Sequence, residues 1–528
     1  MMGNKKLQVW LPLLFSVVMI LGMFFGYRMA GGKAFLKAEK QTSLQEALDL
    51  IRLKYVDKVN LDSLQAGAIE DMMTHLDPHS VYFPPVELKQ VNEELKGSFD
   101  GIGVEFNIFR DTVHIMYVEP NGPSDKAGLQ IGDRILSVND SSLTLHGITS
   151  SQIKDQIKGR SGSKVRLKIL RQGKVLDVEV ARGAIPVPSI DAAYMVNERV
   201  GYIKLNKFTQ TSYEEFMKAM ERLKSEGMTE LIYDLRANGG GFMNEAFDMA
   251  DEFLSGQKLV VYTEGTNSKK EEYKCRRPGI FEEGKLIILI DEYSASASEV
   301  LAGALQDWDR ATIIGRRSFG KGLVQLQYEL SDGSAIRLTT ARYYTPLGRS
   351  IQRPYDKGKK VYMDEFSERY TNGEVLYADS NKISSGTRYL TPDGDTLYGG
   401  GGIMPDIFVP IDTTTYPASV SRLFLNGQVN NYVYRYYLQH RTTIDQLGSL
   451  SDFEKQYVSG ENLWRGFTSD LGDSLRVKEL DAPTRQSVER RMAAYLARFR
   501  WRNSGYFQVM NHDDLMMKRA LEELAKGR

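Results

Sequence analysis

The sequence is poor in the residues that build disulfides and thiolate metal sites. Its 528 residues contain one cysteine, Cys275, and six histidines. A single cysteine excludes an intramolecular disulfide and any zinc cluster built from cysteines. Net charge is also absent, because 68 Lys and Arg residues balance 68 Asp and Glu residues. We therefore predict no metal, no cofactor and no nucleic-acid partner, since nucleic-acid binding depends on positive surface charge.

The length and composition indicate several globular domains. A chain of 528 residues exceeds the size at which one hydrophobic core stops growing, about 250–300 residues, so we expect three to four domains. With 42% hydrophobic and 26% charged residues, the composition is that of a folded protein, which excludes a disordered or fibrous chain.

The N-terminus contains an uncharged apolar run from Leu7 to Tyr27. In a helix such a run spans about 30 Å, the thickness of the hydrocarbon layer. Lys5 and Lys6 precede it, and the positive-inside rule then leaves the chain after Arg28 outside the cytoplasm. We predict an uncleaved single-pass anchor in the cytoplasmic membrane, with the rest of the chain in the periplasm or extracytoplasmic space. The alternative is a cleaved signal peptide, whose apolar region is usually only about 7–15 residues long.

The next segment, from Thr42 to Leu95, has the apolar spacing of helices. It contains the motif His-Leu-Asp-Pro-His-Ser at residues 75–80, whose two histidines stand four positions apart. Two histidines on one helix face could bind a metal, but Pro78 between them favours a turn.

From Gly97 to Ala184 the sequence changes to short β-rich runs separated by turn residues, which predicts a compact β domain. Its motifs resemble a PDZ domain: Gly101-Ile102-Gly103-Val104, then Gly122 to Leu129 and Ile131 to Asn139. The resemblance implies that the loop at Gly101, Ile102, Gly103 and Val104 binds the C-terminal carboxylate of a peptide that pairs with the adjacent strand. The alternative is a β domain whose glycines only make turns.

After Pro188, strands and helices alternate, which predicts βα units. We expect strands at Val200 to Leu205, Glu230 to Leu235 and Leu286 to Asp291, and helices at Tyr213 to Ser225 and Asn244 to Leu254. In such folds, catalytic residues gather where strands end and helices begin.

Two turns in this region carry candidate chemistry. Asp234 to Gly241 ends in three glycines, whose backbone N–H groups could line an oxyanion hole or bind phosphate, although a plain tight turn is the better explanation of this segment on its own. In the second turn, Ser296 lies between a strand and a helix, as a nucleophile would. Ser296 and Glu299 also satisfy the pattern of a helix capping box, so capping is an alternative.

Lys321 follows in Arg316 to Gly322, between two β-like runs. The spacing from Gly315 to Lys321 matches a phosphate-binding loop, but Gly322 stands where Ser or Thr would bind magnesium, and a strand-like pattern follows instead of a helix. We therefore interpret Lys321 as a general base, which must be neutral; burial can lower its pKa by the necessary amount, at a cost of about 4–5 kcal/mol. A histidine base is disfavoured because no histidine lies between Pro186 and Pro410.

The ordered motifs resemble the C-terminal processing peptidases, or tail-specific proteases. They are Asp-Leu-Arg-x-Asn-x-Gly-Gly, Ser-Ala-Ser-Ala-Ser-Glu, Ala-Gly-Ala-Leu-Gln-Asp, Phe-Gly-Lys-Gly-x-Val-Gln, Thr-Pro-Leu-Gly and Gly-Ile-Met-Pro-Asp, and they cover about Ser43 to Pro410. The resemblance implies a ClpP/crotonase-like core and a Ser-Lys dyad formed by Ser296 and Lys321. It also implies that Gln325 orients the lysine, and that the N–H groups of Gly240 or Gly241 and of Ala297 form the oxyanion hole.

Together these patterns predict an α/β multidomain protein. We expect an anchor at 1–33, a helical segment at 34–96, a PDZ domain at 97–184, a serine protease core at 185–410 and a helical extension at 411–528. Within the core, residues 353–401 interrupt the family pattern, either as a surface loop, which we favour, or as a lid. The predicted function is a serine endopeptidase that cleaves exported proteins near their C-terminal tails and forms a homo-oligomer through its extension. The alternative is a PDZ adaptor that binds such tails without cleaving them.

Overall fold

The computed structural model describes residues 5–29, 42–109, 111–143, 147–378, 386–412, 418–458, 461–471 and 480–526. The chain divides into two compact units, Met1–Met72 and Met73–Arg528. The first contains α1 (Lys5–Met29), α2 (Ser43–Lys54) and most of α3 (Leu61–Thr74). The predicted boundary between residues 33 and 34 lies outside the described residues.

The predicted membrane anchor is not supported by the structure. A helix that crosses the hydrocarbon layer needs about 20 mainly apolar residues. Within the described ranges, none of the helices combines that length with sufficient apolar character. The predicted single-pass anchor at Leu7 to Tyr27 is therefore wrong, and so is the localisation to the cytoplasmic membrane that was inferred from it. The structure does not show the predicted membrane contact.

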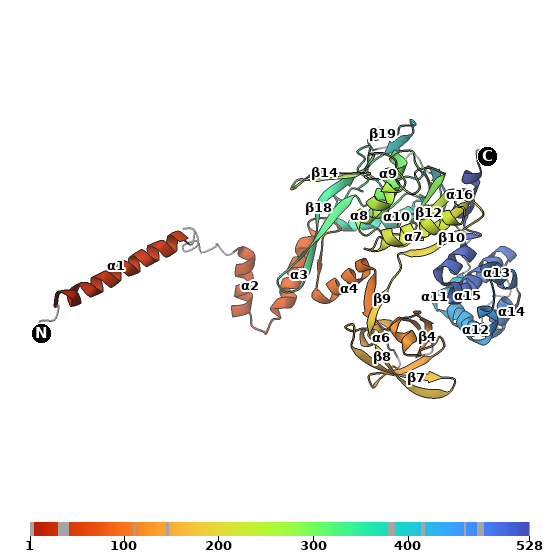
Figure 1. Cartoon of the computed structure of the whole chain (residues 1–528), viewed down its shortest axis with the longest axis horizontal. Coiled ribbons are helices and arrows are strands. Elements are labelled where there is room, and N and C mark those ends of the chain that lie inside the picture. Colours follow the sequence, from red (N-terminus) through yellow and green to blue (C-terminus); the bar gives the residue numbers. More distant parts are fainter. Residues whose placement is uncertain are drawn as a thin grey trace. The chain divides into compact units, whose positions relative to one another are not determined.

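The second unit is built around a six-stranded sheet with the strand order β10-β11-β12-β15-β16-β21. Its strands β10 and β12 are labelled in Figure 1. All neighbouring pairs are parallel except β10 and β11. The strands are β10 (Ile190–Met195), β11 (Val200–Leu205), β12 (Glu230–Asp234), β15 (Leu286–Ile290), β16 (Thr312–Gly315) and β21 (Ile407–Phe408). The helices that follow β11, β12 and β15 are α7 (Ser212–Ser225), α8 (Met243–Asp251) and α9 (Ala297–Asp307). The predicted alternation of strands and helices is confirmed.

Every residue of β11, β12 and β15 is buried, because helices cover both faces of the sheet. On one face, Phe216, Phe247 and Leu301 of α7, α8 and α9 join the largest hydrophobic cluster. On the other face, Met516 and Met517 belong to α16 (Leu515–Ala525) and join a second cluster with residues of the strands.

A second sheet, in which all pairs are antiparallel, completes the core, with the order β1-β18-β13-β14 and β17 paired with β18. Its strands are β1 (Val81–Phe83), β13 (Leu259–Gly265), β14 (Ser268–Lys274), β17 (Leu323–Glu329) and β18 (Ala335–Tyr344), and α4 (Pro85–Lys96) follows β1. β1 belongs to a segment predicted to be helical. It is extended because its three residues pair with β18, more than 250 positions later in the chain.

The PDZ-like domain has its own sheet and its own hydrophobic cluster. The sheet has the order β3 (Val104–Phe109), β4 (Thr112–Val118), β5 (Arg134–Val138), β7 (Lys164–Arg171) and β8 (Lys174–Ala181), and β6 (Ser141–Ser142) pairs with β5. Its helices are α5 (Pro123–Lys126) and α6 (Ser150–Ile157). The domain joins the rest of the chain through β2 (Ser98–Gly101), which pairs with β9 (Gly183–Pro186).

The C-terminal extension is helical, as predicted. Before α16 it contains α11 (Ala418–Leu425), α12 (Gln428–Asp445), α13 (Leu450–Tyr457), α14 (Glu461–Leu471) and α15 (Ala482–Asn511), drawn in blue in Figure 1. The aromatic run at residues 430–437 lies on α12, where Tyr432, Tyr434 and Tyr437 are buried.

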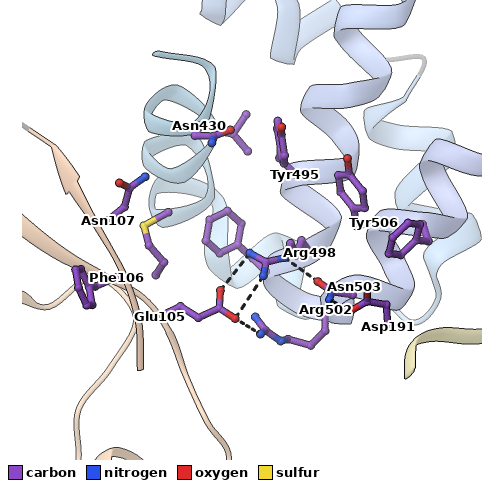
Figure 2. Close-up of a pocket in the computed structure, with 14 residues that line it drawn as sticks. Glu105, Phe106, Asn107, Asp191, Asn430, Tyr495, Arg498, Arg502, Asn503 and Tyr506 are labelled. Atoms are coloured by element: carbon purple, nitrogen blue, oxygen red, sulfur yellow. Dashed lines mark hydrogen bonds and ion pairs between the residues drawn. The ribbon is translucent and has the colours of Figure 1, made fainter. Parts of the chain in front are cut away.

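Residues of α15 contact the first strand of the PDZ-like sheet. Figure 2 shows Arg498 and Arg502 pointing toward Glu105 of β3, and Arg498 forms an ion pair with Glu105 at 3.1 Å. Asn503 donates a hydrogen bond to Asp191 Oδ1 of β10 at 2.6 Å. The extension therefore connects the PDZ-like domain with the central sheet.

The predicted surface loop at 353–401 is wrong in its first part. Residues Lys359–Thr371 form the helix α10, on which Tyr362 and Arg369 are buried. A hairpin of β19 (Arg388–Leu390) and β20 (Thr396–Tyr398) follows. Residues 379–385 lie outside the described residues. The stretch is ordered into a helix because one of its faces packs against the core.

Candidate active site

Ser296 occupies the turn between β15 and α9. It is the N-cap residue of α9, with φ 56° and ψ −111°. A non-glycine residue in such a conformation is strained by about 1–3 kcal/mol, and the strain persists only where surrounding contacts hold the backbone. A turn of this kind exposes a serine hydroxyl at the start of a helix. Ser296 is accordingly only half-buried.

Contacts with the glycine loop after β12 hold this turn. The carbonyl of Asn238 accepts hydrogen bonds from the Ala295 N–H at 3.0 Å and from Ser298 Oγ at 2.9 Å. Ser294 Oγ donates to the carbonyl of Leu235 at 2.8 Å. The two loops are therefore joined at the carboxyl ends of the neighbouring strands β12 and β15, where catalytic residues of α/β folds gather.

The glycine loop also brings backbone donors beside Ser296. A Cβ atom added to Gly240 would lie 2.8 Å from Ser296 Cβ and 3.0 Å from Ala297 N. The Gly240 N–H donates to Asn238 Oδ1 at 2.9 Å. Within the described part of the chain, the N–H groups of Gly241 and Ala297 have no hydrogen-bond acceptor. Of the three predicted oxyanion donors, these two are therefore free.

Glu299 binds the backbone of both predicted catalytic residues. Its Oε2 accepts from the Ser296 N–H at 2.8 Å and from the Lys321 N–H at 2.9 Å. Its Oε1 accepts from Ser318 Oγ at 2.5 Å and from the Gly320 N–H at 2.6 Å. The carboxyl group is 1% exposed, and burial raises its pKa. One side chain thus joins two loops that are more than twenty residues apart in sequence.

Tyr343 makes a second bridge between the same two residues. Its hydroxyl, on β18, lies 3.1 Å from the carbonyl oxygen of Ser296 and 2.5 Å from that of Lys321. The ring is 2% exposed. Tyr343 therefore holds Ser296 and Lys321 through their carbonyl groups, and Glu299 holds the same two residues through their N–H groups.

The surroundings of Lys321 favour its neutral form. Burial lowers the pKa of its ammonium group from 10.5 to about 8, assisted by the positive charge of Arg337, while Glu299 and Asp77 oppose this shift. At pH 7 a lysine with that pKa is neutral in about one molecule in ten, compared with about one in a few thousand for an ordinary lysine. The amine is therefore suited to accept a proton.

Gln325 lies on β17, near the start of the strand. Its amide Nε2 donates to the carbonyl of Leu323 at 3.2 Å and to Thr339 Oγ1 at 3.4 Å. In the part of the chain that the structure describes, its side chain makes these bonds and none to Lys321. The geometry does not show the orienting role that the resemblance implies.

His79 is close to the lysine loop, although it is far away in sequence. Its Nε2 lies 3.0 Å from the Tyr362 hydroxyl, and its ring lies 6.3 Å from that of Phe319 between centroids. Burial, and next the charge of Lys321, lower its pKa to about 4. The two residues before it form the predicted turn, in which Asp77 Oδ1 accepts from the His79 N–H at 2.8 Å. His79 is thus a neutral imidazole beside the site.

Sequence reasoning missed three of these residues. Glu299 was recognised only as half of a capping pair, and its spacing from Ser296 was the available signal. His79 was set aside as part of a turn, and Tyr343 carried no signal. The contacts of all three depend on residues that only the fold brings together.

The predicted peptide loop of the PDZ-like domain lies between β2 and β3. Ile102 is 1% exposed and belongs to the domain's hydrophobic cluster, so its side chain faces the core. Gly103 has φ 75°. Among the described residues, nothing accepts a hydrogen bond from the N–H groups of Ile102 and Gly103. Val104 begins β3, which is at the edge of its sheet.

Three protein-family models match the chain: peptidase family S41 over residues 199–358, PDZ domain over 101–181 and activating protease CtpB N-terminal domain over 29–84. The carboxy-terminal-processing protease of Bartonella bacilliformis is 33% identical over 341 residues, which are 63% of this chain and 78% of that protein. The chain belongs to the carboxy-terminal processing proteases of family S41.

Carboxy-terminal processing protease CtpA of Bacillus subtilis is another similar protein, with 31% identity over 354 residues, covering 66% of this chain and 74% of that protein. A solved structure, the photosystem II D1 C-terminal processing protease, is 24% identical, with a TM-score of 0.37, and the match covers 71% of this chain and 87% of that one.

As an S41 peptidase, the chain is a serine endopeptidase that acts on peptide substrates. The predicted family, fold class and enzymatic activity are therefore confirmed. None of these similarities supports the alternative of a non-catalytic adaptor.

Proposed function

We propose that Ser296 is the nucleophile of this S41 peptidase and that Lys321 is its general base. The observation that carries the proposal is that one buried carboxylate, Glu299, accepts hydrogen bonds from the N–H groups of both residues. The lowered pKa of Lys321 is consistent with the role of a base.

In this mechanism, Ser296 Oγ attacks the carbonyl carbon of the scissile peptide bond while Lys321 Nζ accepts the hydroxyl proton. The oxyanion accepts hydrogen bonds from the N–H groups of Gly241 and Ala297. Lys321 then returns its proton to the leaving amine as the C–N bond breaks. A water molecule then loses a proton to Lys321 Nζ and attacks the acyl-enzyme. As the ester bond breaks, Lys321 passes this proton to Ser296 Oγ and so restores the hydroxyl.

Alanine variants test the dyad. Ser296→Ala and Lys321→Ala should each lower the cleavage of a denatured protein by at least about a thousandfold, because residues that act as one unit lose most of their effect when either is removed. Ser225→Ala and Lys269→Met change the same residue types at exposed positions and should cleave normally. A folded Ser296→Ala or Lys321→Ala protein that cleaves at the normal rate would exclude the proposed dyad.

We also propose that the PDZ-like domain binds the free C-terminus of the substrate. The unoccupied N–H groups of Ile102 and Gly103 support a carboxylate site, and the edge position of β3 supports pairing with an extended peptide. Because the Ile102 side chain is buried, the contact would be made through its backbone.

The domain boundaries at 97–184, 185–410 and 411–528 stay predictions. The separate hydrophobic clusters of the PDZ-like domain and of the C-terminal helices support this division. Homo-oligomerisation through the extension also stays a prediction.

A further inference from the structure

The helix α10 contacts the loop that leads to Ser296. The Tyr370 hydroxyl donates a hydrogen bond to Glu292 Oε1 at 2.6 Å. The ring of Phe366 packs edge-on against Tyr293, with centroids 5.4 Å apart. Glu292 and Tyr293 precede Ser296 by four and three residues, so α10 lies against the nucleophile loop.

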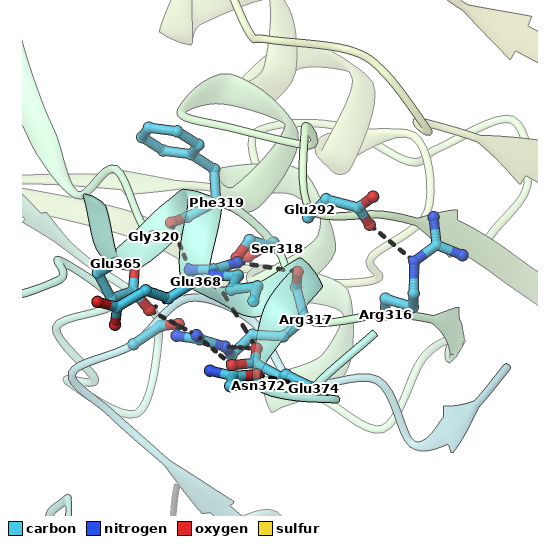
Figure 3. A network of polar contacts seen from close by, with 12 residues as sticks. Glu292, Arg316, Arg317, Ser318, Phe319, Gly320, Glu365, Glu368, Asn372 and Glu374 are labelled. Atoms are coloured by element: carbon cyan, nitrogen blue, oxygen red, sulfur yellow. Dashed lines mark hydrogen bonds and ion pairs between the residues drawn. The ribbon is translucent and has the colours of Figure 1, made fainter. Parts of the chain in front are cut away.

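The same helix contacts the loop that carries Lys321. The guanidinium of Arg369 donates to the carbonyl oxygen atoms of Ser318 at 2.8 Å, Phe319 at 3.2 Å and Arg317 at 3.4 Å. Figure 3 shows this loop beside the acidic residues of α10 and of the turn that follows it. Residues 317–322 have no regular secondary structure, so their carbonyl groups need donors from elsewhere.

Arg369 is well suited to this contact because its guanidinium presents five donors in a planar fork. The three donors of a lysine radiate from one nitrogen atom and do not form such a fork. The Arg369 side chain is 1% exposed, and a buried cation needs compensating charge.

That charge comes from α10 and from the turn after it. Glu365 Oε1 lies 3.4 Å from Arg369 Nε, and Glu365 also pairs with Arg317 at 2.7 Å and with Arg353. Glu374 pairs with Arg317 at 2.6 Å. Arg353 in turn lies over the ring of Phe319, 4.4 Å from its centroid. The network thus connects α10 with several points of the lysine loop.

We infer that α10 is a positioning element that holds the loops of Ser296 and Lys321 at a fixed separation, and that Arg369 is the positioning residue for the lysine loop. The inference rests on the proposed Ser-Lys dyad. It assigns a role to the interruption at 353–401 that is neither a surface loop nor a lid.

Loss of Arg369 should change the environment of Lys321 as well as its position. The charged and titratable groups that act on or contact Lys321 are Glu299 of α9, Arg337 and Tyr343 of β18, and Asp77 and His79 of the turn before β1. None of them lies on α10. A loosened loop admits water to the amine and raises its pKa toward 10.5, and each unit lowers kcat/KM at pH 7 about tenfold.

The test measures kcat and KM against pH for Arg369→Ala, Arg369→Lys and Lys360→Met. Lys360 is an exposed cation on the same helix and serves as the control. We expect Arg369→Ala to lower kcat at least tenfold, to leave KM within about twofold, and to move the acidic limb of kcat/KM upward by about one pH unit. Arg369→Lys should be intermediate, added guanidinium should partly restore Arg369→Ala, and Lys360→Met should behave as the unmodified enzyme.

A folded Arg369→Ala enzyme with unchanged kcat and an unchanged acidic limb would overturn the inference, as would a rise in KM alone. If that variant does not fold, Tyr370→Phe removes only the hydroxyl and its bonds to Glu292 and Tyr293. It should lower kcat at least twofold, and an unchanged kcat would equally overturn the inference. The dyad is tested separately. An active Ser296→Ala protein would refute the proposed function. If Ser296→Ala is inactive but the Arg369 variants behave normally, only the role of α10 is refuted.

Discussion

Replacing Glu299 by glutamine tests whether one carboxylate holds both residues of the dyad. Its two oxygen atoms accept four hydrogen bonds, from the N–H groups of Ser296, Gly320 and Lys321 and from Ser318 Oγ. Glutamine keeps one oxygen and leaves two of the four donors facing an amide nitrogen. An unsatisfied buried donor costs about 1–3 kcal/mol, so the free energy of unfolding should fall by about 2–6 kcal/mol.

The same substitution changes the charge near Lys321. The carboxylate of Glu299 favours the ammonium form of the lysine. Tyr343 and Arg369 still hold the lysine loop in this variant, so the loss of charge decides the shift and should lower the pKa of Lys321 below about 8. The acidic limb of kcat/KM, which rises as the base loses its proton, should therefore move to lower pH. At the same time kcat should fall at least about tenfold at every pH, because the two reacting groups are held less well.

The assay combines thermal unfolding with kcat/KM measured against pH. Glu252→Gln is the control, since Glu252 is 2% exposed and accepts from the Tyr213 hydroxyl at 2.5 Å and from the Ile280 N–H at 2.8 Å. It should lose stability but keep the acidic limb. The reasoning would be refuted if Glu299→Gln unfolded at the normal temperature, or if its acidic limb moved to higher pH.

Two further predictions concern the glycine loop and the PDZ-like domain. Gly240→Ala should abolish cleavage and lower the unfolding temperature, because Gly240 has φ 97° and a Cβ there would lie 2.7 Å from the Ala295 carbonyl oxygen. The control is Gly239→Ala, whose Cβ would meet no atom within 4 Å and which should cleave nearly as well as the unmodified enzyme. Equal activity of the two variants would contradict the close contact. A peptide with a free C-terminus should bind the protein at least about tenfold more tightly than its C-terminal amide, since only the carboxylate can accept charge-assisted hydrogen bonds from the N–H groups of Ile102 and Gly103; equal affinities in calorimetry would exclude that site.

Much of the fold could be predicted because its signals are local. β15 is a continuous apolar run and β11 and β12 are mainly apolar, as expected for strands buried on both faces, and turn residues mark their ends. The prediction of a membrane anchor failed although it also rested on a local signal, the uncharged apolar run from Leu7 to Tyr27. α10 was missed because its buried face is formed by Tyr362 and Arg369, two polar residues that a search for apolar periodicity does not detect.

The sequence by itself determined the family, the serine and lysine as candidates, and the glycine loop beside them, because each is a short motif whose chemistry can be recognised from residue types and spacing. Only the tertiary structure decided how these motifs meet. Glu299 and Tyr343 join Ser296 to Lys321, and His79 reaches Tyr362 across 283 positions of the chain. Such contacts depend on the register and packing of distant elements, which no local pattern in the sequence records.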